Sequence, residues 1–167
     1  MNAKSAGTPN SPSPTPAAPG PVAGLWPVFI TAHAVLIEQV EARLAVAELP
    51  QLAWYDVLWA LERAGEGRMR LAGLAEKVVL SRSNMTRLID RLEEAGLVRR
   101  ERSAEDRRGA FAALTPAGAA MRARMWPVYQ QAIGELFERH LEAGEAEKMQ
   151  AALRRMLAAA RGHAAPD

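Results

Sequence analysis

Arginine and short polar side chains share one ten-residue stretch, residues 82–91. An arginine guanidinium can donate two hydrogen bonds to guanine, an asparagine amide pairs with adenine, and hydroxyl groups bond to several bases. A charged outer face of an ordinary amphipathic helix would hold a similar set, so these residue types alone leave both interpretations open. The members of this set are Arg82, Ser83, Asn84, Thr86, Arg87 and Arg91.

A second candidate group follows at Asp106, Arg107 and Arg108, directly before Gly109. An arginine on a thin turn can enter a narrow minor groove, where the negative potential of DNA is enhanced. A neighbouring carboxylate can hold such an arginine through a charge-assisted hydrogen bond. The alternative is a turn that local ion pairs stabilise without any ligand.

Charge is unevenly distributed along the chain. The net charge of the whole chain is +2, yet residues 68–108 carry eleven basic and seven acidic side chains, a net charge of +4. A basic patch on a nearly neutral protein favours a polyanionic partner. The alternative is that these arginines pair with the nearby acids Glu93, Glu94, Glu101 and Glu105.

Apolar spacing indicates which elements must position these groups. Met85, Leu88, Ile89 and Leu92 recur at helical spacing, which predicts a helix that ends near Glu94 and begins with Ser81 or Ser83 as its cap. A short strand at 68–71 and a helix at 71–78 precede it. Strand-like segments at 97–102 and 111–114 follow, and the turn between them carries the charged tip. This order predicts a winged helix-turn-helix, whose second helix would enter the major groove.

Longer helices are predicted on both sides of this lobe. Apolar residues recur over 22–47 and 52–63, and Thr115 caps a helix that begins at Pro116. Trp126–Pro127 should kink or restart that helix, and a last helix covers 145–160. The fold class is therefore mainly α with a small β wing, a winged helix-turn-helix lobe plus N- and C-terminal dimerisation helices. Residues 1–21 hold six of the eleven prolines and predict a disordered tail.

The quoted segments resemble the MarR (multiple-antibiotic-resistance regulator) family. Its helix-turn-helix pattern is matched by 71–76 and 80–100, its wing by Asp106–Arg107–Arg108–Gly109, and the start of its next helix by 114–118. The resemblance covers about 25–157. It implies one domain over 22–161, with the winged helix at about 52–115 and dimerisation helices at about 22–47 and 116–160.

The resemblance also implies a mode of action. Members of the family are homodimers that present two recognition helices to a pseudo-palindromic operator in double-stranded DNA. By the motif match, Ser83, Asn84, Thr86 and Arg87 read bases, Asp106 orients the wing, and Arg108 enters the minor groove. Apolar stripes outside the winged helix independently favour a dimer, because one small domain cannot easily bury them all.

A small phenolic or anionic effector is a further expectation from the family. Its pocket would lie where the dimerisation helices meet the winged lobe, and aromatic walls with a few polar groups suit such a pocket. For the aromatic and histidine candidates given below, the alternative is ordinary packing at the core or the interface. Asp56 lies in the same region, and its alternative role is a local cap or ion pair. The candidate pocket residues are Trp26, His33, Trp54, Tyr55 and Trp59.

Composition argues against several other classes of protein. The chain has no cysteine, so thiol chemistry is excluded, and its three histidines lie far apart, which disfavours a metal site. No secretory signal or membrane-spanning run is visible, which favours the cytoplasm. No cofactor is expected. A winged-helix module that binds protein or RNA remains the alternative function, and an enzyme is disfavoured because no nucleophile–base pair or nucleotide loop is visible.

Overall fold

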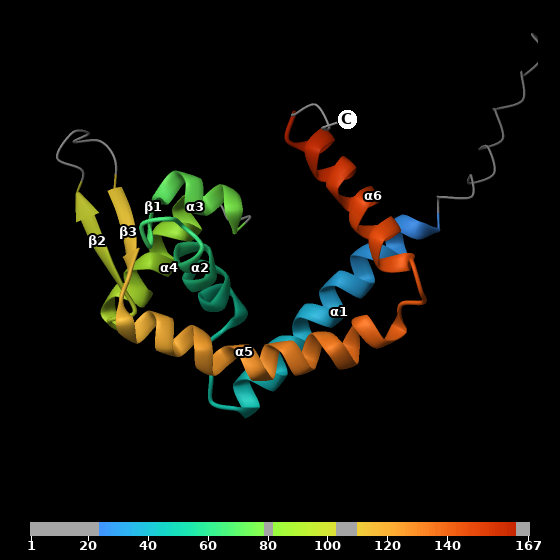
Figure 1. Ribbon diagram of the computed structural model, residues 1–167, viewed down its shortest axis with the longest axis horizontal. Coiled ribbons are helices and arrows are strands. Elements are labelled where there is room, and N and C mark those ends of the chain that lie inside the picture. The colour runs from blue at the N-terminus through green and yellow to red at the C-terminus, as the bar shows by residue number, and fades with distance from the viewer. Residues whose placement is uncertain (1–23, 79–81, 103–109, 163–167) are drawn as a thin grey trace, which may run out of the picture. The chain divides into compact units, whose positions relative to one another are not determined.

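The computed structural model describes residues 24–78, 82–102 and 110–162 (Figure 1). The side chains of Arg82, Ser83 and Arg102 fall outside this description, as do the predicted tail 1–21, the predicted cap Ser81 and the predicted tip Asp106–Gly109. The chain divides into two compact units, residues 1–34 and 35–167, which are described separately.

The described part of the first unit is the beginning of helix α1 (Leu25–Val46). Pro27 lies in the first turn, where a backbone N–H has no partner within the helix in any case. The rings of Trp26 and Phe29 lie 6.1 Å apart between centroids, and both side chains are exposed.

The second unit begins within α1 and contains the winged lobe. Each element that the sequence predicted for this lobe is present within a residue or two of its expected bounds. After α1, the elements of the second unit are α2 (Leu52–Glu62), β1 (Arg68–Arg70), α3 (Leu71–Lys77), α4 (Arg82–Glu94), β2 (Val98–Arg102), β3 (Ala110–Leu114), α5 (Pro116–Leu136), the 3-10 helix η1 (Glu138–His140) and α6 (Glu145–Ala160).

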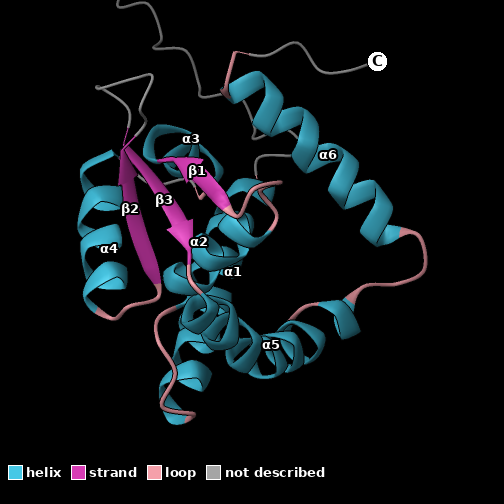
Figure 2. Cartoon of the chain, turned by 60° about the vertical axis from the view of Figure 1, so that its left-hand side comes forward, coloured by secondary structure: helices cyan, strands magenta, loops and turns pink. Residues whose placement is uncertain are grey.

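The strands form a three-stranded antiparallel sheet in the order β1-β3-β2 (Figure 2). Met69 and Arg100 both lie opposite Ala112, so these residues share one face of the sheet. Arg70 and Glu101 lie opposite Phe111 on the other face. The guanidinium groups of Arg68 and Arg70 lie 5.7 and 5.1 Å from the centre of the Phe111 ring.

The core of the winged lobe confirms the predicted apolar face of α4. Met85, Leu88, Ile89 and Leu92 are almost fully buried against side chains of α2, α3 and the sheet. Burying side chains of this size stabilises a fold by about 1.5–3 kcal/mol each. Their burial on one face leaves the opposite face of α4 available to a partner.

A second core cluster joins α1, α2 and α5. It contains Val40, Leu44, Tyr55, Met125 and Ala132. The Oε1 atom of Glu41 accepts a hydrogen bond of 3.0 Å from the backbone N–H of Leu52, which caps the first turn of α2. This cluster connects the winged lobe to the long helices of the second unit.

Thr115 makes the junction between the lobe and α5 and is the predicted cap. Its hydroxyl accepts a hydrogen bond of 3.0 Å from the backbone N–H of Gly118 and donates one of 2.8 Å to the carbonyl oxygen of Gly96. A Cβ atom added at Gly118 would lie 2.1 Å from the carbonyl oxygen of Leu97. Only glycine therefore allows α5 to approach the turn after α4 this closely.

Two expectations for the C-terminal helices need correction. The chain stays helical through Pro127, so the predicted restart is wrong; packing of α5 on α2 and α1 holds the helix despite the missing backbone donor. The helix then ends at Leu136, before Phe137, and a 3-10 turn follows that the periodicity did not predict. Met156 and Leu157, on the predicted stripe of α6, are 58% and 51% exposed.

Candidate nucleic-acid interface

The face of α4 that points away from the buried stripe carries several residues that the sequence predicts to contact DNA. Asn84, Thr86, Arg87 and Arg91 are all exposed. Arg87 and Arg91 form no ion pair or hydrogen bond with any described residue. Two guanidinium groups one turn apart can therefore meet phosphates or base edges.

An open hollow lies beside this face, between α4 and the start of α2. Its volume is about 670 Å³. Its lining includes Ala53, Asn84, Arg87 and Arg91. The basic face thus borders a recess rather than a flat surface.

Five other predicted contact residues have side chains that lie outside the described part of the chain. The backbone of Arg82 and Ser83 opens α4, while their side chains lie outside the description. Asp106, Arg107 and Arg108 lie wholly outside the described residues. Their assignment to the wing contact remains a prediction from the sequence.

Several arginines of the basic segment are held by acids, in line with the alternative interpretation. Arg99 Nη2 lies 2.7 Å from Glu101 Oε1, and Arg68 Nε lies 2.8 Å from Glu66 Oε2. The hydrogen bond from the Arg99 guanidinium is the main cause that holds the pKa of Glu101 below its usual value. Arg100 is paired with acids of α4. Among the described arginines of this segment, Arg87 and Arg91 on α4 have no acidic partner.

The aromatic residues of α2 point in different directions. Trp54 packs against the core of the winged lobe, and Tyr55 is buried where its ring stacks on Trp126 at 6.0 Å and meets Tyr129 edge-on at 5.0 Å. Trp59 remains 43% exposed. Trp26 and His33 belong to the first unit and are exposed there.

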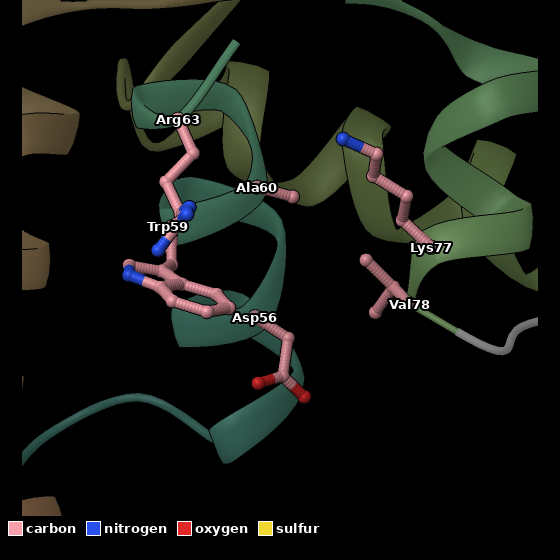
Figure 3. A pocket seen from close by; sticks show the side chains of 6 residues that line it. All are labelled: Asp56, Trp59, Ala60, Arg63, Lys77 and Val78. Carbon is pink, nitrogen blue, oxygen red and sulfur yellow. The ribbon is translucent and has the colours of Figure 1, made fainter. Parts of the chain in front are cut away.

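Trp59 lines a second hollow, of about 370 Å³, between α2 and the end of α3 (Figure 3). The Arg63 guanidinium lies 5.1 Å from the centre of the Trp59 ring, and Lys77 and Val78 approach from α3. Burial, with a smaller contribution from the nearby Glu41 carboxylate, raises the pKa of Asp56 to about 6. The hollow therefore combines an aromatic wall, two cations and an acid that binds a proton readily.

Sequence reasoning missed Arg63 and Lys77. Arg63 follows Trp59 by four residues, the spacing at which helical side chains meet, so that pair was available as a signal. No sequence signal places Lys77 beside Trp59, because only the packing of α3 on α2 brings these two residues together. Asp56 was expected to cap or pair locally; among the described residues its carboxylate has no hydrogen bond or ion pair.

Comparison with known proteins gives the same picture as the geometry. Residues 50–109 match the model of the MarR family. The segment from α2 to β2 is therefore similar to the MarR family. AbsC of Streptomyces coelicolor, a MarR family transcriptional regulator, superposes with a TM-score of 0.77 at 29% identity, over 84% of this chain and 94% of AbsC.

Two further transcriptional regulators are similar to this chain. Sco3205 of Streptomyces coelicolor, a MarR family transcriptional regulator solved in complex with DNA, gives a TM-score of 0.76 at 26% identity, over 81% of this chain and 84% of its own. The HTH-type transcriptional regulator YfiV of Bacillus subtilis is 47% identical over 49 residues. That match spans 29% of this chain and 31% of YfiV.

No helix in the described ranges is both long and apolar enough to cross a membrane. Within the same ranges, no group of histidine and acidic side chains is arranged to hold a metal ion.

Proposed function

We propose that this chain is a homodimeric, sequence-specific DNA-binding transcriptional regulator that acts as a repressor. The main supporting observation is that Arg87 and Arg91 are exposed on α4 and form no ion pair with a described residue, while the other side of this helix is buried in the core. The MarR-type lobe and the similarity to DNA-bound Sco3205 support the proposal. An operator with two-fold symmetry matches a dimer with two such helices.

The dimer is part of this proposal. In the second unit, Val35, Ile37, Met156 and Leu157 are all more than a third exposed, and no residue of α6 is buried. Apolar stripes of this kind are typical of surfaces that a second chain covers. Residues 22–47 and 116–160 are the proposed dimerisation helices.

Selection from random 30-base-pair duplexes, read by sequencing, tests the proposal. Wild-type protein should enrich a two-fold-symmetric motif, and Arg108→Ala should weaken the enrichment by about 1–3 kcal/mol if the wing contact is as proposed. An absence of enrichment at low salt would overturn operator binding. It would favour the alternative, a winged-helix module that binds protein.

A small phenolic or anionic effector that releases the DNA is a second part of the proposal. The hollow at Trp59 supports it, because an aromatic ring could stack on the indole while Arg63 and Lys77 face an acidic group. A ligand lowers DNA affinity by its preference for the conformer that does not fit the operator.

Quenching of tryptophan fluorescence by salicylate, a simple phenolic acid, tests this part. The effect should be smaller in Lys77→Gln and absent in Trp59→Leu, whereas Lys148→Gln on α6 serves as a matched control. Release of operator DNA at the same salicylate concentration is expected. Equal quenching in Lys77→Gln and the wild type would remove this hollow from the proposal.

A further inference from the structure

Arg100 connects the wing to the recognition helix at three successive turns. From β2, its Nη2 atom lies 2.5 Å from Asp90 Oδ1 and donates a hydrogen bond of 3.4 Å to the carbonyl oxygen of Thr86. Its Nη1 atom lies 3.6 Å from Glu93 Oε2, and its backbone N–H donates a bond of 2.9 Å to Glu93 Oε1. One residue of β2 thus contacts most of the length of α4.

These contacts follow one line along α4. Thr86, Asp90 and Glu93 are spaced by four and three residues, so they share a face of the helix. That face lies between the buried stripe that contains Leu92 and the exposed face that carries Arg87 and Arg91. Figure 2 shows α4 lying along β2.

The contacts add what the buried stripe cannot provide. Apolar burial is non-directional, so it holds α4 against the lobe without strictly fixing its rotation about its own axis. A guanidinium is planar and donates in fixed directions. Its contacts with Asp90 and the Thr86 carbonyl, together with the longer ion pair to Glu93, resist both rotation and sliding of α4. The bond to the Thr86 carbonyl reaches the same turn whose side chains are predicted to read bases.

Engagement with acids also separates Arg100 from the arginines that face a partner. Two carboxylates neutralise its charge, whereas Arg87 and Arg91 have no such partner among the described residues. An arginine whose N–H groups already donate to acceptors within the protein contributes little to phosphate binding.

We infer that Arg100 is a positioning residue, which fixes the orientation of the recognition helix against the wing and thereby sets sequence specificity. The inference rests on the proposed function, since it concerns how the same interface reads DNA. Its consequence is that loss of Arg100 should affect the ratio of specific to non-specific affinity and leave the electrostatic part of binding unchanged.

The test compares Arg100→Gln and Arg100→Lys with wild type, using the enriched operator and a scrambled duplex at several salt concentrations. We expect the specificity ratio to fall roughly 5- to 100-fold in Arg100→Gln, the range of one good base contact. Arg100→Lys should fall nearly as far, because one ammonium cannot reach three turns. The slope of log affinity against log salt should stay at the wild-type value.

Arg99→Gln is the matched control. Arg99 is the neighbouring arginine on the same strand and pairs with Glu101 instead of α4, so its loss should leave the specificity ratio unchanged. Asp90→Asn is the second variant, needed if Arg100→Gln fails to fold. It keeps Arg100 and removes one anchor, and it should also lower the ratio.

Two outcomes would overturn the inference. If Arg100→Gln weakens operator and scrambled DNA equally and reduces the salt slope by about 0.9, Arg100 is a phosphate contact. If Asp90→Asn leaves the specificity ratio at the wild-type value, the contacts of Arg100 with α4 do not set specificity. Failure of the proposed function itself would be distinct, because wild-type protein would then show no difference between the two duplexes.

Discussion

Arginines that look alike in the sequence have different partners in the structure. Arg99 and Arg100 are adjacent, yet the first pairs with Glu101 on its own strand and the second with α4. Arg87 and Arg91 pair with no described residue. The charge of +4 over 68–108 is therefore not spread over one uniform surface, and each arginine has its own expected mutant effect.

Arg87→Ala should weaken operator binding by about 1–3 kcal/mol and relax the sequence preference at one position in each half-site. The reason is that its guanidinium is exposed on the recognition face without a protein partner. Binding titrations against operators with single base changes would measure both effects. Lys148→Ala, a basic residue of α6, should change neither; an equal loss in both variants would contradict a direct base contact.

Asp56 predicts a pH dependence of stability. Its folded pKa of about 6 lies above the unfolded value of about 3.9, so the native chain binds the additional proton between these values. The free energy of unfolding should therefore fall as pH rises through this window, and the loss is complete above about pH 6. Asp56→Asn should avoid it and gain roughly 2–3 kcal/mol at pH 7.5.

Urea unfolding of wild type and Asp56→Asn at pH 4 and pH 7.5 measures this difference. The two proteins should have similar stability at pH 4 and diverge at pH 7.5. Glu76→Gln, an exposed acid of α3, should show no such divergence. A gain in Asp56→Asn that is equal at both pH values would mean that burial of Asp56 is unrelated to its titration.

At the scale of elements, the sequence predicted those helices whose position depends on interactions between neighbouring residues. The spacing of Met85, Leu88, Ile89 and Leu92 predicted α4, and Thr115 predicted the start of α5, because side-chain periodicity and capping depend on nearby residues. Gly118 is an example of what the sequence did not predict. Its role depends on the close approach of Leu97, which lies in the turn after α4, and no sequence pattern indicates that contact.

The candidate site was predictable to a similar degree. The polar face of α4 followed from the helical period, whereas the three-turn grip of Arg100 and the meeting of Lys77 with Trp59 arise only when strands and helices pack. Helical continuity through Pro127 also depends on packing. The proline alone favours a break, and the buried neighbours Met125 and Ala132 hold the helix together.

Gly118→Ala should destabilise the chain by about 1–3 kcal/mol or more, because the new methyl group meets a backbone carbonyl that cannot rotate away. Gly134→Ala is the matched control in the same helix. The nearest atom to its added Cβ is a Glu138 carboxylate oxygen at 4.0 Å, so it should stabilise by about 0.5–1 kcal/mol. Thermal unfolding should thus shift in opposite directions; a stabilised Gly118→Ala would refute the close contact.

At the scale of the whole molecule, exposed apolar side chains connect stability to assembly. An obligate dimer is stabilised by its own concentration, so the midpoint of thermal unfolding should rise with protein concentration. Met156 and Leu157 are the exposed members of the α6 stripe that such an interface would cover.

Leu157→Glu should therefore shift the chain from dimer to monomer in sedimentation experiments, and operator affinity should fall with it. A charge buried at an apolar interface costs several kcal/mol unless it is paired. Ala151→Glu, an exposed residue on the opposite side of α6, should remain dimeric. If wild-type protein is monomeric at micromolar concentration, the proposed dimer is wrong.

The continuity of α5 has a mechanical consequence. At 1.5 Å per residue, its 21 residues make a rod of about 30 Å that starts at the turn after α4. A tilt of about 5° at one end of such a rod displaces the other end by roughly 2.5 Å. Pro127 lies near the middle and leaves one rung of the hydrogen-bond ladder empty, so it is the place where the rod flexes most easily. Leverage and compliance are thus built into the same helix, and the position of this proline determines how much of a displacement is transmitted and how much is absorbed.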